Sequence, residues 1–182
     1  MQTLIVLLRG VNVGGAGTGL PMDRFRAVLS DLGCRDVRTY IQSGNAVLRS
    51  DRDPAALADA ISGAIRLPNG TQPMTIVLTL AEIEHSLAAN PYPSASAHPR
   101  TLHLLFLSPD ALPDLAALAA LTAPHERVAL GGRVLYLLTP DGAGASTLAN
   151  RAPRHLGGGT GTARNLSTVT ALAAMARAAA GD

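Results

Sequence analysis

A glycine-rich stretch that follows a short apolar run offers the clearest chemistry in this sequence. The run Leu4–Leu8 ends at Arg9, and Asn12, Gly14 and Gly15 follow closely. A buried strand that passes into a glycine-rich turn presents backbone N–H groups, and such groups bind anions. Arg9 would add a positive charge. We therefore expect a small anionic or polar ligand at this loop.

Known nucleotide-binding fingerprints do not fit the loop. Gly15 and Gly17 are followed by Leu20 where the dinucleotide motif requires a third glycine. All 15 basic residues are arginine, so the chain has neither a Walker A lysine nor a lysine for Schiff-base chemistry. A structural interpretation stays open, in which the glycines form a turn and Arg9 pairs with a carboxylate or with carbonyl groups.

The polar turn around Ser43 is a second candidate. Ser43 and Asn45 offer a hydroxyl and an amide to a ligand, although Gly44 and Asn45 also suit a turn that needs positive φ. A serine nucleophile needs a neighbouring base, and no histidine lies near Ser43 in sequence. The catalytic residues therefore stay unknown, and an enzyme acting on the ligand is an alternative to a binding protein.

Arg164 and Asn165 form a third candidate, because they precede the last expected helix. Arginine and helix amides together can hold an anion, but Asn165 or Ser167 can equally cap the helix. The glycine-rich residues 157–161 lose much backbone freedom on ordering, so we expect the following segment to dock on polar groups. We predict that Arg164 or Asn165 lies beside the loop after the first strand.

Histidine spacing predicts no metal site and no cofactor. No two histidines stand three or four residues apart, and no His-Glu-x-x-His motif occurs. The five histidines are His85, His98, His103, His125 and His155.

Hydrophobic periodicity indicates the elements that position the first two candidates. The expected elements are a strand at 4–8, a helix at 22–32, strands at 37–41 and 46–48, a helix from 53, and a strand at 75–78. This βαββαβ order predicts a ferredoxin-like unit. Strand directions then place the loop 14–19, the turn 42–45 and the connection 67–72 at one end of the sheet.

The pattern recurs after a Pro/Ser/Ala-rich segment at 91–100. We expect a strand at 101–107, a helix at 108–121, a hairpin at 127–138, a short helix at 145–151 and a closing helix at 167–180. The fold class is therefore α/β (α+β), with two ferredoxin-like βαββα(β) units and a C-terminal helix. The expected boundaries are a first unit at 1–90, a linker at 91–100 and a second, partial unit at 101–182.

Composition narrows the possible partners. Hydrophobic residues make up 47% and charged residues 15%, with a formal charge of +2, which is typical of a globular domain and does not favour nucleic-acid binding. No apolar run approaches the length of a membrane span, so we expect a cytoplasmic protein. Tyr40 and Tyr136 on expected strands leave an RNA- or protein-binding module with an open sheet face as a further alternative. The oligomeric state is not predicted.

Several motifs together resemble one protein family. The matching stretches are 9–15 (RGVNVGG), 36–45 (DVRTYIQSGN), 90–92 (NPY), 131–133 (GGR) and 163–165 (ARN). They resemble an uncharacterised bacterial family, domain of unknown function 1697. The resemblance implies an α/β protein of ferredoxin-like halves without an assigned activity. The chain departs from the family pattern in its lysine-free glycine loop, in the absence of basic residues at 144–148, and at Leu166, where an aromatic residue is common.

Overall fold

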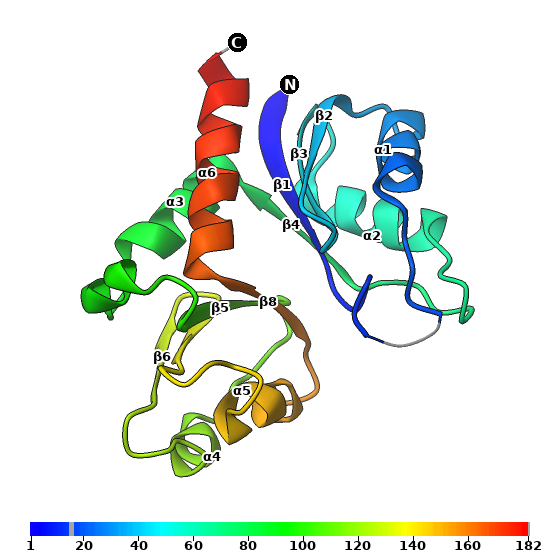
Figure 1. The fold of residues 1–182 in the computed structure, drawn as a ribbon. Helices are drawn as coiled ribbons and strands as arrows, with labels where there is room; N and C mark the ends of the chain where they lie inside the picture. Colours follow the sequence, from blue (N-terminus) through cyan, green and yellow to red (C-terminus); the bar gives the residue numbers. More distant parts are fainter. Residues whose placement is uncertain (15–16, 182) are drawn as a thin grey trace. The chain divides into compact units, whose positions relative to one another are not determined.

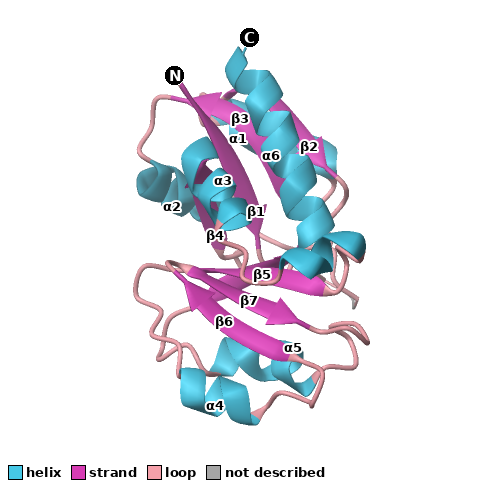
Figure 2. Ribbon diagram, turned by 90° about the vertical axis from the view of Figure 1, so that its left-hand side faces the viewer, coloured by secondary structure: helices cyan, strands magenta, loops and turns pink. Residues whose placement is uncertain are grey.

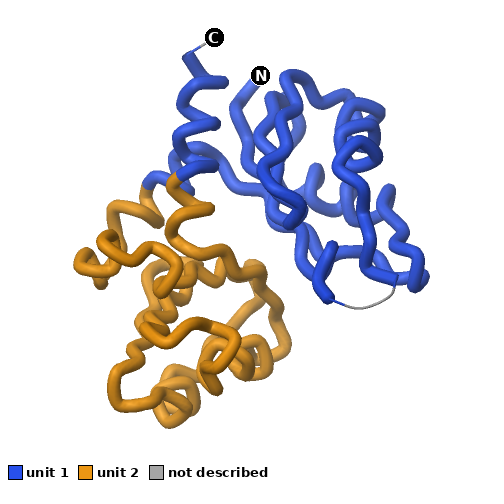
Figure 3. The backbone as a smooth tube through the Cα atoms, in the orientation of Figure 1, with its two compact units in different colours: residues 1–84, 171–182 blue, residues 85–170 orange. Residues whose placement is uncertain are grey.

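The computed structural model describes residues 1–14 and 17–181 of the 182-residue chain. The chain forms two compact units, one of residues 1–84 and 171–182 and the other of residues 85–170 (Figure 3). The segment 91–100, interpreted from sequence as a linker, belongs to the second unit and contains a short 3-10 helix, η1 (Pro93–Ala97).

The first unit is a ferredoxin-like βαββαβ fold, as predicted. Its elements are β1 (Gln2–Leu8), α1 (Met22–Asp31), β2 (Arg35–Tyr40), β3 (Asn45–Ser50), α2 (Pro54–Ala64) and β4 (Thr75–Thr79). The strands form one antiparallel sheet in the order β2-β3-β1-β4. The helices α1 and α2 lie on the same side of this sheet (Figure 1).

The second unit repeats this topology in full. Its elements are β5 (Leu102–Leu107), α4 (Leu115–Ala120), β6 (Arg127–Gly131), β7 (Val134–Leu138), α5 (Thr147–Arg151), the 3-10 helix η2 (Ala152–Arg154) and β8 (Gly161–Asn165). The sheet order is β6-β7-β5-β8, with α4 and α5 on one face (Figure 2). We expected only a partial copy, because the sequence of β8, GTARN, has no apolar alternation. Its antiparallel pairing with β5 makes it a strand nonetheless.

Two helices continue from one unit into the other. They are α3 (Leu80–Ala88) and α6 (Leu166–Gly181). We expected α6 to begin after Ser167, but Asn165 caps it, because the Asn165 Oδ1 accepts a 2.9 Å hydrogen bond from the Thr168 N–H. No helix in the described part of the chain has the length and hydropathy needed to cross a bilayer.

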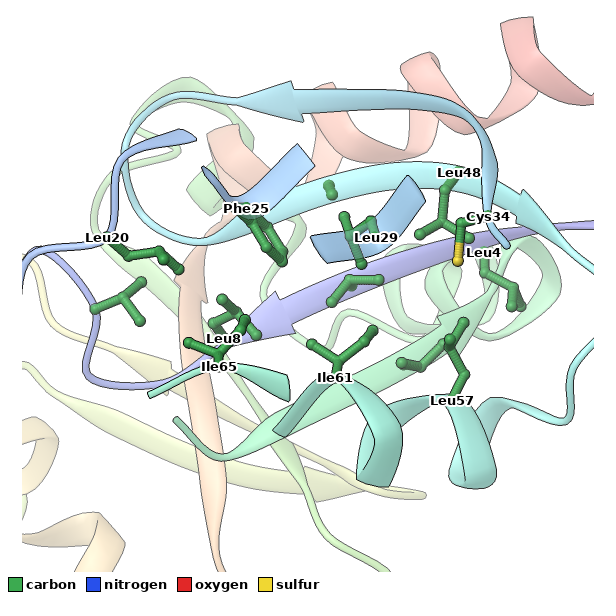
Figure 4. Packing of buried hydrophobic residues seen from close by; sticks show 14 of the residues in the cluster. Leu4, Leu8, Leu20, Phe25, Leu29, Cys34, Leu48, Leu57, Ile61 and Ile65 are labelled. Carbon is green, nitrogen blue, oxygen red and sulfur yellow. The ribbon is translucent and has the colours of Figure 1, made fainter. Parts of the chain in front are cut away.

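The core of the first unit fills the space between its sheet and α1 and α2. Leu4 and Leu8 point from β1 toward Phe25, Leu29 and Ile61, and all five side chains are buried (Figure 4). Burying each such side chain contributes about 1.5–3 kcal/mol.

The opposite face of β1 is equally apolar. Successive side chains of a strand alternate between its faces, so Ile5 and Leu7 point away from α1 and α2, and neither has any exposed surface. The 171–181 part of α6 lies on this side of the sheet (Figure 1). β1 is therefore buried on both faces and holds the loop that follows it on a rigid base.

Candidate functional site

Three loops of the first unit meet at one end of its sheet. The Leu8 N–H donates a 2.8 Å hydrogen bond to Gly44 O, which joins the end of β1 to the β2–β3 turn. The Asn69 N–H donates a 3.0 Å bond to Gly17 O, which joins the α2–β4 connection to the glycine loop. The prediction that these three segments share one end of the sheet is confirmed.

Asn12 holds the glycine loop to the neighbouring turn. Its Nδ2 donates to Leu20 O at 2.9 Å and to Gln42 O at 2.8 Å, and its Oδ1 accepts from the Leu20 N–H at 2.8 Å. Both amide hydrogens are thus used within the protein. The Asn12 side chain therefore ties together the segments around it. A ligand contact by this side chain stays a prediction, and it would have to use the remaining lone pair of Oδ1.

The backbone after β1 turns left-handed at two positions. Gly10 has φ of 76° and Asn12 has φ of 53°. Both residues are therefore left-handed, and Val11 lies between them. Alternation of left- and right-handed residues can turn the N–H groups of consecutive residues toward one concavity, and here the Asn12 N–H already donates to Thr18 O at 2.9 Å. Among the described residues, the N–H groups of Gly10, Val11 and Val13 have no hydrogen-bond partner.

Arg9 stands at the start of this loop. Its N–H donates a 2.8 Å hydrogen bond to Met74 O, which anchors its backbone, and its side chain is exposed. Gly14 is exposed as well, whereas Gly15 lies outside the described residues. The structure therefore puts a positive charge next to the loop, and its role toward a ligand stays a prediction.

The β2–β3 turn is held in a strained conformation. Ile41 has φ of 47°, which is unusual for a β-branched residue and costs on the order of 1–3 kcal/mol. Its side chain is 52% exposed, so burial of that side chain offsets little of this cost. Gly44 has φ of 69°, and a Cβ there would lie 2.6 Å from the Cγ2 atom of Val11. The packing of Gly44 against the loop fixes the turn.

Ser43 and Asn45 lie at this turn but differ in their surroundings. Ser43 is half-buried in the turn, whereas Asn45 is fully buried at the start of β3, where its Nδ2 donates to Tyr40 O at 3.2 Å. The alternative interpretation, a turn with positive φ at Gly44 and Asn45, holds for Gly44 only, because the left-handed residues of the turn are Ile41 and Gly44. Asn45 is buried because it begins β3, which is an interior strand of the sheet.

Arg164 and Asn165 lie in the second unit, on β8. The Arg164 Nη1 donates to Thr162 Oγ1 at 2.9 Å and to Ala163 O at 2.7 Å. Burial lowers the pKa of Arg164 to about 10, so the guanidinium is still protonated at neutral pH. Asn165 caps α6, which agrees with the alternative, structural interpretation of this segment as a helix cap. The prediction that one of the two lies beside the loop after β1 stays a prediction.

The histidine and acidic side chains of the described residues are scattered over both units. No group of three or more His, Cys, Asp or Glu side chains in the described part of the chain could hold a metal ion. His125 Nε2 pairs with Asp141 Oδ2 at 2.7 Å on the surface of the second unit. Burial lowers the pKa of His103, whose Nδ1 has no hydrogen-bond partner among the described residues.

Comparison with known proteins identifies the family of this chain. Residues 1–136 match the family described as Protein of unknown function (DUF1697). The chain belongs to this family. No curated protein matches it.

A solved structure shares the fold of this DUF1697 member. The structure of conserved bacterial protein SP0830 from Streptococcus pneumoniae is 22% identical, with a TM-score of 0.74 over 96% of this chain and 98% of that one. At this identity the likeness shows the fold of both units and nothing about a ligand.

Two features of the site were missed at the sequence level. Asparagine in a glycine-rich loop is a residue type that tolerates left-handed backbone, so Asn12 could have been identified as the residue that orders the loop. Ile41 carries no such signal, because isoleucine is among the residues least suited to positive φ.

Proposed function

We propose that the loop end of the first unit binds a small anionic ligand in the cytoplasm. The proposal is carried by one observation: the N–H groups of Gly10, Val11 and Val13 have no partner among the residues that the structure describes, and the backbone turns left-handed at Gly10 and Asn12. Arg9 would complete the site as its positive group.

The hydrogen bonds of Asn12 favour an anion-binding role for this loop over the role of a simple connecting turn. The bonds from Asn12 tie it to Leu20 and Gln42 before any ligand arrives, so ordering the backbone around Asn12 costs an anion-bound state little further entropy. A hydrogen bond to a charged group contributes about 1.5–3 kcal/mol. Two or three such bonds to a phosphate or carboxylate would give a dissociation constant in the micromolar to millimolar range.

The test is a titration of the 15N-labelled protein with inorganic phosphate, followed by NMR. We expect saturable shifts of the amide signals of Gly10, Val11 and Val13. Unchanged amide signals up to tens of millimolar phosphate would count against the proposal. Native mass spectrometry of protein purified without denaturation would then identify a ligand retained from the cell.

Arg9 is tested with a matched pair of substitutions. Arg9→Met keeps the apolar stem, removes the charge and should weaken phosphate binding about tenfold. Arg52→Met is the control, since exposed Arg52 follows β3 at the opposite end of the sheet, where Ser50 pairs with Gln2. Equal affinity of both folded variants would refute the role of Arg9, and an unfolded Arg9→Met protein would assign Arg9 a structural role.

The alternative of an RNA platform has little support. Tyr136 is 1% exposed and its hydroxyl donates a 2.8 Å hydrogen bond to Ser86 O. A stacking platform needs exposed aromatic faces, so of the two candidate residues only the half-buried Tyr40 is accessible.

A further inference from the structure

The second unit carries an open groove of about 800 Å³, and all residues that line it belong to this unit. One wall is formed by residues of the segment 94–101, which runs from the second residue of η1 to the start of β5. The other wall is formed by Leu138 at the end of β7 and by Pro140. The volume lies in the range of small-molecule sites, about 300–1,000 Å³.

The 94–101 wall is fixed by a regular series of backbone hydrogen bonds. Ala95 N–H donates to Tyr92 O at 3.0 Å, His98 N–H to Ala95 O at 3.0 Å, and Thr101 N–H to His98 O at 2.9 Å. Thr139 N–H then donates to Thr101 O at 2.7 Å, which ties the wall to the residue that follows β7. The groove is therefore largely formed before a ligand binds, as is usual for small-molecule sites.

The lining of the groove combines an apolar surface with positive charge. Alanine, proline and leucine side chains form most of it, including Ala97, Pro99 and Leu138. Arg100 and His98 are the ionisable residues among the lining residues, and no carboxylate lines the groove in the described part of the chain. This combination complements a molecule with an apolar body and one negative charge, and it disfavours a cation.

We propose that this groove binds a small amphiphilic anion, such as a medium-chain carboxylate or an aromatic sulfonate. The apolar body lies against Ala97, Pro99 and Leu138, and the acidic group lies near Arg100. The site lies in the second unit and uses none of the residues of the proposed phosphate site. Failure of either proposal therefore leaves the other standing.

The test is a competition assay with the fluorescent probe 8-anilinonaphthalene-1-sulfonate. The competitor is decanoate below its micellar concentration, and decanol is its uncharged control. We expect saturable fluorescence enhancement of the sulfonate by the folded protein, displacement by decanoate, and weaker displacement by decanol. Decanol that competes as well as decanoate would overturn the proposal, because the charge would then play no part.

Substitutions locate the site. Arg100→Gln should weaken decanoate binding about tenfold, as expected for the loss of one hydrogen bond to a charged group, and should leave decanol binding unchanged. Ala97→Phe, at an exposed position, should fill the groove and abolish binding of both. Arg151→Gln is the control, because Arg151 on α5 does not line the groove.

Equal decanoate affinity of the wild-type protein and of Arg100→Gln and Ala97→Phe would overturn the proposal. Circular dichroism checks that each variant is folded. If Ala97→Phe is not, Ser94→Phe at another exposed position of the same wall takes its place.

Discussion

Replacing Gly44 with alanine tests whether the β2–β3 turn is fixed by its contact with the loop after β1. The new Cβ would lie 2.6 Å from Val11 Cγ2 and 2.7 Å from Leu8 Cβ, distances that force a shift. Overpacking of this kind costs about 1–3 kcal/mol, and alanine at a φ of 69° adds about 1 kcal/mol. We expect Gly44→Ala to lower the free energy of unfolding by about 3 kcal/mol.

Gly70→Ala provides a matched control. Gly70 has φ of 82°, but a Cβ there would meet nothing within 4 Å. Only the backbone cost of about 1 kcal/mol applies. The difference between Gly44→Ala and Gly70→Ala, about 2 kcal/mol, therefore isolates the close approach of Gly44 to the loop.

Urea unfolding of the full chain, followed by circular dichroism at 222 nm, measures both variants. With an m-value of about 1–1.5 kcal/mol/M for a unit of this size, the midpoint of the first unit should fall by roughly 2 M in Gly44→Ala and by less than 1 M in Gly70→Ala. Hydrogen exchange, measured on peptides from β1 and β3, shows whether the unfolding transition that shifts is that of the first unit. Coincident midpoints of the two variants would refute the reasoning.

Three further predictions concern other residues. Asn12→Ala removes three hydrogen bonds, each worth about 1 kcal/mol, so it should destabilise the first unit by about 2–3 kcal/mol and speed hydrogen exchange in the glycine loop. Asn165→Ala should cost about 1 kcal/mol because it removes the cap of α6, whereas thermal melting of Ser167→Ala should match that of the wild type. Burial lowers the pKa of His103 below the ordinary 6.5, so the unfolded chain takes up a proton first as the pH falls. The stability that depends on neutral His103 is complete above pH 6.5 and is lost below it. Urea midpoints at pH 7.5 and 5.5 should differ less in His103→Gln than in the wild type, while the exposed control His85→Gln should keep the full difference.

The topology of the first unit could be predicted from sequence because two of its strands are marked by apolar runs. β1 and β4 are short stretches of leucine, isoleucine and valine, and the order of elements then fixes the direction of every strand. The convergence of three loops at one end of the sheet follows from direction alone, without knowledge of any side chain.

The parts that could not be predicted depend on packing between distant residues. β8 is recognisable only through its pairing with β5, because a short edge strand needs no apolar alternation. The left-handed backbone of Ile41 opposes the preference of its own residue type, and it stands in a turn whose Gly44 packs closely against Val11 and Leu8. The groove along 94–101 was missed because a Pro/Ser/Ala-rich composition indicates a linker equally well.

The split of the first unit between residues 1–84 and 171–182 has a consequence for its synthesis. A ribosome completes all four strands of the first sheet early, and then makes the entire second unit before it adds residues 171–181. During that interval the sheet face that carries Ile5 and Leu7 has no helix from this segment to cover it. That apolar face of the growing chain is thus open to aggregation and to chaperone binding, and the first unit reaches its final structure only after the second has been translated.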